Sequence, residues 1–131
     1  MFIKKALDGD VITIHGDGSQ TRSMGYVGDV AKGTFLAIEN PKAVGQIINI
    51  GSSEEVSVKK SADIIMGVAK RLSPKAKKAR IEYIPMKKVF GDYKEIARRV
   101  PSLAKAGALL GYKPKIHFKK AVEMVALEMA R

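Results

Sequence analysis

The chain has 131 residues, a formal net charge of +11 at pH 7 and no cysteine. This length predicts a single domain over residues 1–131, large enough to bury roughly two thirds of its unfolded surface. The lack of cysteine excludes a disulfide framework, a thiol nucleophile and a zinc–thiolate site. No apolar run approaches the roughly 20 residues that span a bilayer, and residues 1–5 lack the apolar core of a signal peptide. We therefore expect a cytoplasmic protein with no membrane partner.

The positive charge predicts attraction to polyanions, which include nucleic acid, phosphorylated metabolites and acidic protein surfaces. Its densest run is Lys75–Arg80. No aromatic residues are interleaved with these lysines to stack on bases, which argues against nucleic acid as the partner. A solvated lysine-rich loop is the simpler interpretation of this run. A basic binding module for nucleic acid or an acidic protein remains the alternative.

The apolar spacing along the chain predicts helices that alternate with short strands. The predicted helices cover residues 2–7, 27–38, 58–72, 103–110 and 118–129, and the predicted strands cover 11–14, 46–50 and 81–84. Ser57 and Asp29 are placed to cap the helices that begin beside them. The strand at 46–50 is expected to be buried, and residues 86–100 to be irregular or extended. The fold class is therefore α/β, with a small mixed sheet of few strands packed with four to five helices.

The segment 16–29 is the most informative part of the chain. An alternating strand ends just before it, and Asp17-Gly18 gives a turn that tolerates positive φ. Arg22 follows, beside the hydrogen-bonding side chains of Gln20 and Thr21. An arginine presented next to a strand end suits a phosphate or a carboxylate, because its planar fork donates two parallel hydrogen bonds. The alternative for Arg22 is an ordinary surface ion pair.

Three blocks of the sequence resemble those of NAD-dependent nucleotide-sugar epimerases, dehydratases and decarboxylases, the extended short-chain dehydrogenases. They are "ITIHGDGSQTRSMGYVGDVAKG", "AVGQIINIGSSEEVSVKKSADII" and "VFGDYKEIARRVPSLAKAGALLGYKPK", in that order. UDP-glucose 4-epimerase and UDP-glucuronate decarboxylase are the nearest by pattern. The resemblance implies the fold of their C-terminal, substrate-binding domain, with the Rossmann core largely absent.

The resemblance also implies a nucleotide-sugar pocket and its residues. Arg22 would reach the diphosphate, with Gln20 near the nucleotide, and Arg99 would be the second cation on the diphosphate or ribose. The alternative for Arg99 is a salt bridge with Glu95 one helical turn away. Ser102 stands where the family usually carries Asp. It can cap the next helix, but it lacks the carboxylate that would accept hydrogen bonds from ribose hydroxyls.

The 131 residues carry no set of catalytic or cofactor-binding groups. The family's chemistry needs a Gly-rich dinucleotide turn and a helical Tyr-x-x-x-Lys pair, and the sequence contains neither. Tyr83 and Lys87 match the second motif by letter, but Pro85 between them prevents a shared helix face. The only histidines, His15 and His117, have no further metal-ligand pattern. We therefore expect no catalytic residue, no metal and no cofactor bound by this chain alone, although the complete family uses NAD.

The sequence thus predicts the part of an epimerase or dehydratase that binds a UDP- or dTDP-linked sugar, not catalytically competent alone. Such a part would leave apolar surface uncovered, so we expect a homo-oligomer or a separate chain that carries the Rossmann domain. The basic binding module and a non-functional remnant of an epimerase are the alternatives.

Overall fold

The computed structural model describes residues 1–91 and 95–131. The α-helices within this range are α1 (Phe2–Asp8), α2 (Val27–Glu39), α3 (Val58–Leu72), α4 (Met86–Phe90), α5 (Ala104–Leu110) and α6 (Phe118–Met129). The strands are β1 (Val11–His15), β2 (Thr21–Ser23), β3 (Glu55–Ser57), β4 (Arg80–Ile84) and β5 (Arg98–Arg99). Short 3₁₀ turns at Pro41–Ala43 and Pro74–Lys78 follow α2 and α3.

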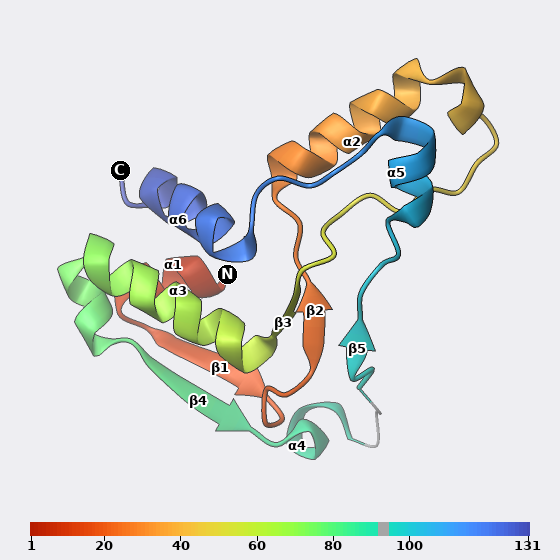
Figure 1. Ribbon diagram of the computed structural model, residues 1–131. Coiled ribbons are helices and arrows are strands. Elements are labelled where there is room, and N and C mark those ends of the chain that lie inside the picture. The colour runs from red at the N-terminus through yellow and green to blue at the C-terminus, as the bar shows by residue number, and fades with distance from the viewer. Residues whose placement is uncertain (92–94) are drawn as a thin grey trace.

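The strands form two small sheets. β1 and β4 pair in parallel, and β2 lies between antiparallel β3 and parallel β5. Figure 1 shows the three-stranded sheet between two groups of helices, with α1, α3 and α6 on one side and α2 beside α5 on the other. The predicted α/β class with few strands is confirmed. The strands are divided between two sheets rather than joined in one, because β1 and β2 separate after the turn at residues 16–20.

The main hydrophobic core lies between β1 and three helices. β1 alternates, so Ile12 and Ile14 point to the core and are almost completely buried. α3 supplies the opposite wall, and its first turn is capped by Ser57 Oγ, which accepts a hydrogen bond from Lys60 N at 3.1 Å. The cap predicted from the sequence is confirmed. The other buried apolar residues of this core are Ala6, Leu7, Val56, Ala62, Ile65, Met66, Val68, Ala69, Ala76, Ala79, Phe118, Val122 and Ala126.

A second, smaller core joins α2 to α5. Its buried residues are Ala106, Leu110 and Tyr112. Gly33 of α2 allows the close approach: a Cβ atom there would lie 2.6 Å from Ile50 Cγ2 and 2.8 Å from Tyr112 Cε2. Those distances are far inside van der Waals contact, so any larger residue would push the helix away. The lack of a Cβ atom at Gly33 therefore sets how closely α2 packs against Ile50 and Tyr112.

The prediction for residues 46–50 is wrong, and the prediction for residues 86–100 is wrong in part. Residues 46–50 have no regular secondary structure and pair with no strand in the described part of the chain, and Ile47 is 89% exposed. A strand needs a hydrogen-bonded neighbour, and an apolar run in the sequence does not show whether one is present. Residues 86–100 are predicted to be irregular or extended; β5 agrees with that prediction, whereas α4 is a short helix that the prediction lacks. Part of that stretch, residues 92–94, lies outside the described residues.

The environment of Tyr112 leads us to expect that the free energy of unfolding depends measurably on pH. Its hydroxyl donates a hydrogen bond to the Gly51 carbonyl at 2.7 Å. Burial, and then the charge of Asp29, raise the pKa of Tyr112 above its ordinary value. Because the folded pKa is the higher one, this contribution is fully present below about pH 10, the unfolded pKa, and is lost as the pH rises through the folded pKa.

We expect Tyr112→Phe to lower the free energy of unfolding by about 1 kcal/mol at pH 7, since the Gly51 carbonyl loses its partner. The difference from the wild type should shrink above about pH 10. Urea unfolding at several pH values measures both effects. Tyr83→Phe, which changes an exposed tyrosine, is the control and should not reproduce this pattern. A difference between Tyr112→Phe and wild type that grows at alkaline pH would contradict the prediction.

Candidate functional site

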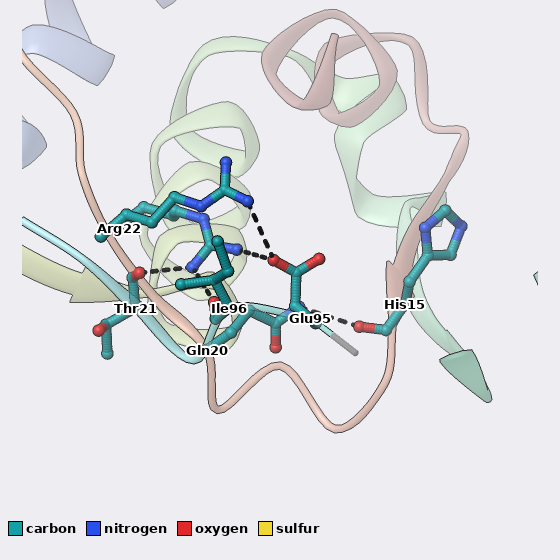
Figure 2. A network of polar contacts seen from close by, with 7 residues as sticks. His15, Gln20, Thr21, Arg22, Glu95 and Ile96 are labelled. Carbon is teal, nitrogen blue, oxygen red and sulfur yellow. Dashed lines mark hydrogen bonds and ion pairs between the residues drawn. The ribbon is translucent and has the colours of Figure 1, made fainter. Parts of the chain in front are cut away.

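Arg22 is held at the centre of the three-stranded sheet. Its Nη1 donates hydrogen bonds to the carbonyl of Thr21 at 2.7 Å and to that of Ile96 at 3.0 Å. Its Nη2 contacts the carboxylate of Glu95. Figure 2 shows the guanidinium between these acceptors. With only 24% of its side chain exposed, Arg22 is a fixed cation rather than a solvated one.

Arg99 lies directly beside Arg22. β5 and β2 run parallel, and their register pairs Arg22 with Arg99 and Thr21 with Arg98. Paired residues on neighbouring strands project to the same face of a sheet. Nη2 of Arg99 lies 4.0 Å from Oε1 of Glu95, the same oxygen that Arg22 contacts. The two arginines singled out from the sequence lie 77 positions apart in the chain, and the strand register brings them together at one carboxylate.

The ion pair between Arg99 and Glu95 differs from the helical one considered from the sequence. Arg99 belongs to a strand, and the pair spans the approach to β5 rather than a helical turn. Arg99 is 53% exposed, so its guanidinium is much freer than that of Arg22. Sequence reasoning missed that Glu95 also binds Arg22, because strand pairing alone brings these distant residues together.

The opposite face of the same sheet carries a separate ion pair. Nε of Arg98 donates to both carboxylate oxygens of Glu55, at 3.2 and 3.1 Å, and the Thr21 hydroxyl donates to the same carboxylate at 2.6 Å. These contacts, with the Thr21 hydrogen bond first and Arg98 second, hold the pKa of Glu55 below its ordinary value. Adjacent arginines thus serve opposite faces, and only Arg99 shares the face of Arg22.

Gln20 and Ser102 have structural contacts. Nε2 of Gln20 donates to the His15 carbonyl at 3.0 Å, which closes the turn before β2 (Figure 2). The Ser102 carbonyl accepts a hydrogen bond from Asn49 Nδ2 at 3.4 Å, and its hydroxyl accepts one from Ala104 N at 3.5 Å. Neither contact involves the two arginines. Their predicted roles beside a nucleotide stay predictions.

Asp29 has a different role from the cap predicted for it. α2 begins at Val27, with Tyr26 as the N-cap residue, so Asp29 lies inside the first turn. Its buried carboxylate oxygen Oδ2 accepts hydrogen bonds from the backbone N–H groups of Lys115 and Ile116, at 2.9 and 2.8 Å. The backbone N–H of Phe118 donates in the same way to Glu54 Oε2 at 2.7 Å. Two carboxylates therefore fasten the segment before α6, a function that sequence spacing could not indicate.

A cavity of about 340 Å³ adjoins Arg22. Its walls are mostly apolar, and among the described residues that line it Arg22 is the one with a charged side chain. These lining residues are Met1, Phe2, Ile3, Arg22, Met24, Val58, Ser61, Ile65, Phe118 and Val122. A cation attracts an anion more strongly at the wall of an apolar space than in open water, because less water screens the charge. The cavity thus leaves room beside the cation for the uncharged part of a ligand.

Other kinds of site have less support in the described residues. Tyr83 lies in β4 and Lys87 in α4, so the letter match to Tyr-x-x-x-Lys does not form a pair on one helix. Within residues 1–91 and 95–131, no cluster of three or more His, Cys, Asp or Glu side chains could hold a metal ion. In the same part of the chain no helix has both the length and the apolar character needed to cross a membrane.

The mixed α/β fold corresponds to part of the fold of extended short-chain dehydrogenases. The family model of GDP-mannose 4,6 dehydratase matches residues 1–125. The chain therefore belongs to this family of NAD-dependent nucleotide-sugar epimerases and dehydratases, as the three sequence blocks predicted.

Several members resemble the chain over almost all of its length. UDP-N-acetyl-alpha-D-glucosaminuronate decarboxylase of Bacillus cytotoxicus is 32% identical over 93% of the chain and 36% of the relative. The epimerase Mth375 of Methanothermobacter thermautotrophicus has a TM-score of 0.79 and 30% identity, over 99% of this chain and 38% of that one. UDP-glucuronic acid 4-epimerase of Bacillus cereus, solved with UDP-glucuronic acid and NAD, has a TM-score of 0.78 and 26% identity, over 99% and 39%.

The chain thus spans less than two fifths of the length of these relatives. It corresponds to part of such an enzyme.

Proposed function

We propose that this chain forms the nucleotide-sugar-binding portion of an NAD-dependent epimerase or dehydratase, with a UDP- or dTDP-linked sugar as its ligand. The observation that carries the proposal is the register between β2 and β5, which sets Arg22 beside Arg99 on one face of the sheet. Both guanidiniums reach the same carboxylate oxygen of Glu95. The pair already binds an oxyanion supplied by the protein itself.

A diphosphate is the ligand group that fits such a pair best. It carries two adjacent charged phosphoryl groups, and two planar guanidiniums can neutralise and orient both of them. Arg22 supplies a fixed point because two backbone carbonyls hold its Nη1. Arg99 is exposed and can move to meet the second phosphate. The apolar cavity beside Arg22 offers space for an uncharged part of the same ligand.

The proposal assigns binding, but not catalysis, to these residues. The sequence contains neither a Gly-rich dinucleotide turn nor a helical Tyr-x-x-x-Lys pair. Hydride exchange with NAD and the accompanying proton transfer would need groups from elsewhere in the enzyme. The chain alone is therefore expected to bind the nucleotide sugar and to leave it unchanged.

Calorimetric titration of the isolated chain tests this function. UDP-glucose, a dTDP-linked sugar, UDP and NAD are added separately, and the products are examined after long incubation. Binding of a nucleotide sugar, with no binding of NAD and no conversion, is the expected result. Tight NAD binding or turnover by the chain alone would contradict the proposal, as would the absence of binding to every nucleotide tested.

A second titration, with DNA or RNA at several salt concentrations, separates the proposal from a basic binding module. If the lysines of the run Lys75–Arg80 bind a polyanion, affinity for DNA or RNA should fall steeply with salt and depend on Lys75, Lys77 and Lys78. The nucleotide-sugar proposal expects alanine substitutions at these three lysines to leave UDP binding unchanged. It expects the dependence to lie on Arg22 and Arg99 instead.

The partner proposed for this portion is the rest of the enzyme, on the same polypeptide or on a separate chain. Val27, Phe35 and Ile38 form an exposed apolar row along α2. In Figure 1, α2 lies at the edge of the molecule. The relatives have more than half of their length beyond the matched region, which is ample to cover this row. An apolar row of this kind indicates an interface.

We expect the isolated chain to self-associate weakly through this row, and the change Phe35→Glu with Ile38→Glu to make it monomeric. The carboxylates would face water without loss of packing, because both side chains are already exposed. Sedimentation equilibrium measures the association, and thermal unfolding checks that the fold is retained. Val125→Glu with Leu127→Glu, on α6, is the matched control and should leave the association unchanged. A tight dimer would instead identify a second copy as the partner of this row.

A further inference from the structure

We propose that Glu95 is an internal competitor for the anion site, and that its carboxylate occupies the place between Arg22 and Arg99 that a ligand's diphosphate takes. This inference rests on the proposed function, since it concerns the same pair of arginines. It assigns to Glu95 the role of setting how tightly the site binds. A bound diphosphate would displace this carboxylate from the two guanidiniums.

The hydrogen-bond donors of Arg22 show why the carboxylate and a ligand compete. Nη1 is occupied by the carbonyls of Thr21 and Ile96. Glu95 takes one N–H of Nη2, so three of the five N–H donors of the guanidinium have acceptors within the described chain. Its same oxygen lies 4.0 Å from Nη2 of Arg99. A phosphate oxygen that bridged the two arginines would have to take this position.

Charge supports the same conclusion. Arg22 and Arg99 bring two positive charges to one point, and Glu95 cancels one of them. All three side chains share the face on which Arg22 and Arg99 are paired, whereas Arg98 and Glu55 balance each other on the other face. Removing the Glu95 charge would therefore double the net charge that an incoming anion meets.

The position of Arg22 should survive the loss of this charge. Two of its three acceptors are backbone carbonyls, which no side-chain substitution at position 95 removes. If Glu95 served only to hold Arg22 in place, its removal would weaken anion binding. If it competes with the ligand, its removal would strengthen binding. The two roles therefore predict opposite changes in anion affinity when the charge of Glu95 is removed.

The experiment titrates the wild type, Glu95→Gln and Glu55→Gln with UDP and with inorganic pyrophosphate by calorimetry. Glutamine keeps the size and hydrogen-bonding reach of the side chain and removes its charge. We expect Glu95→Gln to bind both anions roughly three- to tenfold more tightly. Glu55→Gln removes the matching charge on the other face of the sheet and should change neither affinity by more than about twofold.

Each outcome decides the inference. The inference would be overturned if Glu95→Gln bound pyrophosphate no more tightly than the wild type, or if neither of these two proteins bound it. Tighter pyrophosphate binding by Glu95→Gln, with UDP bound no better than pyrophosphate, would uphold the competitor and contradict the proposed nucleotide-sugar function. If Glu95→Gln unfolds, Glu95→Asp replaces it: the shorter carboxylate should reach the arginines less well and give a smaller gain in pyrophosphate affinity.

Discussion

Arg22→Ala is expected to weaken binding of UDP-glucose by about 30- to 100-fold. Each hydrogen bond between an arginine and a phosphate contributes roughly 1.5–3 kcal/mol, and Arg22 is the more firmly held of the two cations. Arg99→Ala should have a smaller effect, about tenfold, because its exposed side chain must become ordered on binding. Calorimetric titration measures both losses.

The control for this prediction is Arg98→Ala. Arg98 is the neighbour of Arg99 in β5, but it pairs with Glu55 on the opposite face, so its loss should change UDP-glucose affinity by less than about twofold. Arg22 also binds two backbone carbonyls, so thermal unfolding must show that Arg22→Ala is folded. Equal losses for Arg98→Ala and Arg99→Ala would mean that general positive charge, rather than the paired site, binds the ligand.

Ile14→Ala is expected to lower the free energy of unfolding by about 2–5 kcal/mol. Ile14 is 1% exposed and lies on the inner face of β1, so truncation of its side chain leaves a cavity in the main core. A domain of this kind has a total stability of about 5–15 kcal/mol, so the loss would be a large part of it. Denaturant unfolding measures the change.

Ile47→Ala is the matched control, because it makes the same deletion at a residue that is 89% exposed. Its effect should stay within about 0.5 kcal/mol. The comparison also tests the place of residue 47 in the isolated chain. A loss at Ile47 as large as that at Ile14 would mean that the segment 46–50 is buried, for example by self-association of the chain.

Local patterns in the sequence predicted most of the elements. α3 needed only an apolar face, a serine cap and a closing proline, all within 18 residues, and it forms where expected. Residues 46–50 are equally rich in apolar side chains, yet they pair with no strand in the described chain. An apolar run indicates which side chains avoid water. It does not record whether the neighbour that covers them belongs to the same 131 residues.

The candidate site could likewise be predicted from the sequence only in part. The motifs around Arg22 and Arg99 and their resemblance to a family could be recognised along the chain. The role of Asp29 could not, because its partners lie 86 and 87 positions away and are backbone N–H groups that have no signature in the sequence. The double contact of Glu95 was missed for a related reason: one of its partners is near in sequence and the other is not.

The sequence by itself therefore determined the family, the α/β class, most helices and the two arginines, since each depends on residue types at short spacing. Only the tertiary structure decided that these arginines are neighbours, that Glu95 lies against both, and that the apolar row of α2 faces outward. The physical reason is that strand register and packing depend on contacts between distant segments. A shift in the register between β2 and β5 would separate Arg22 from Arg99 without altering the sequence of either motif.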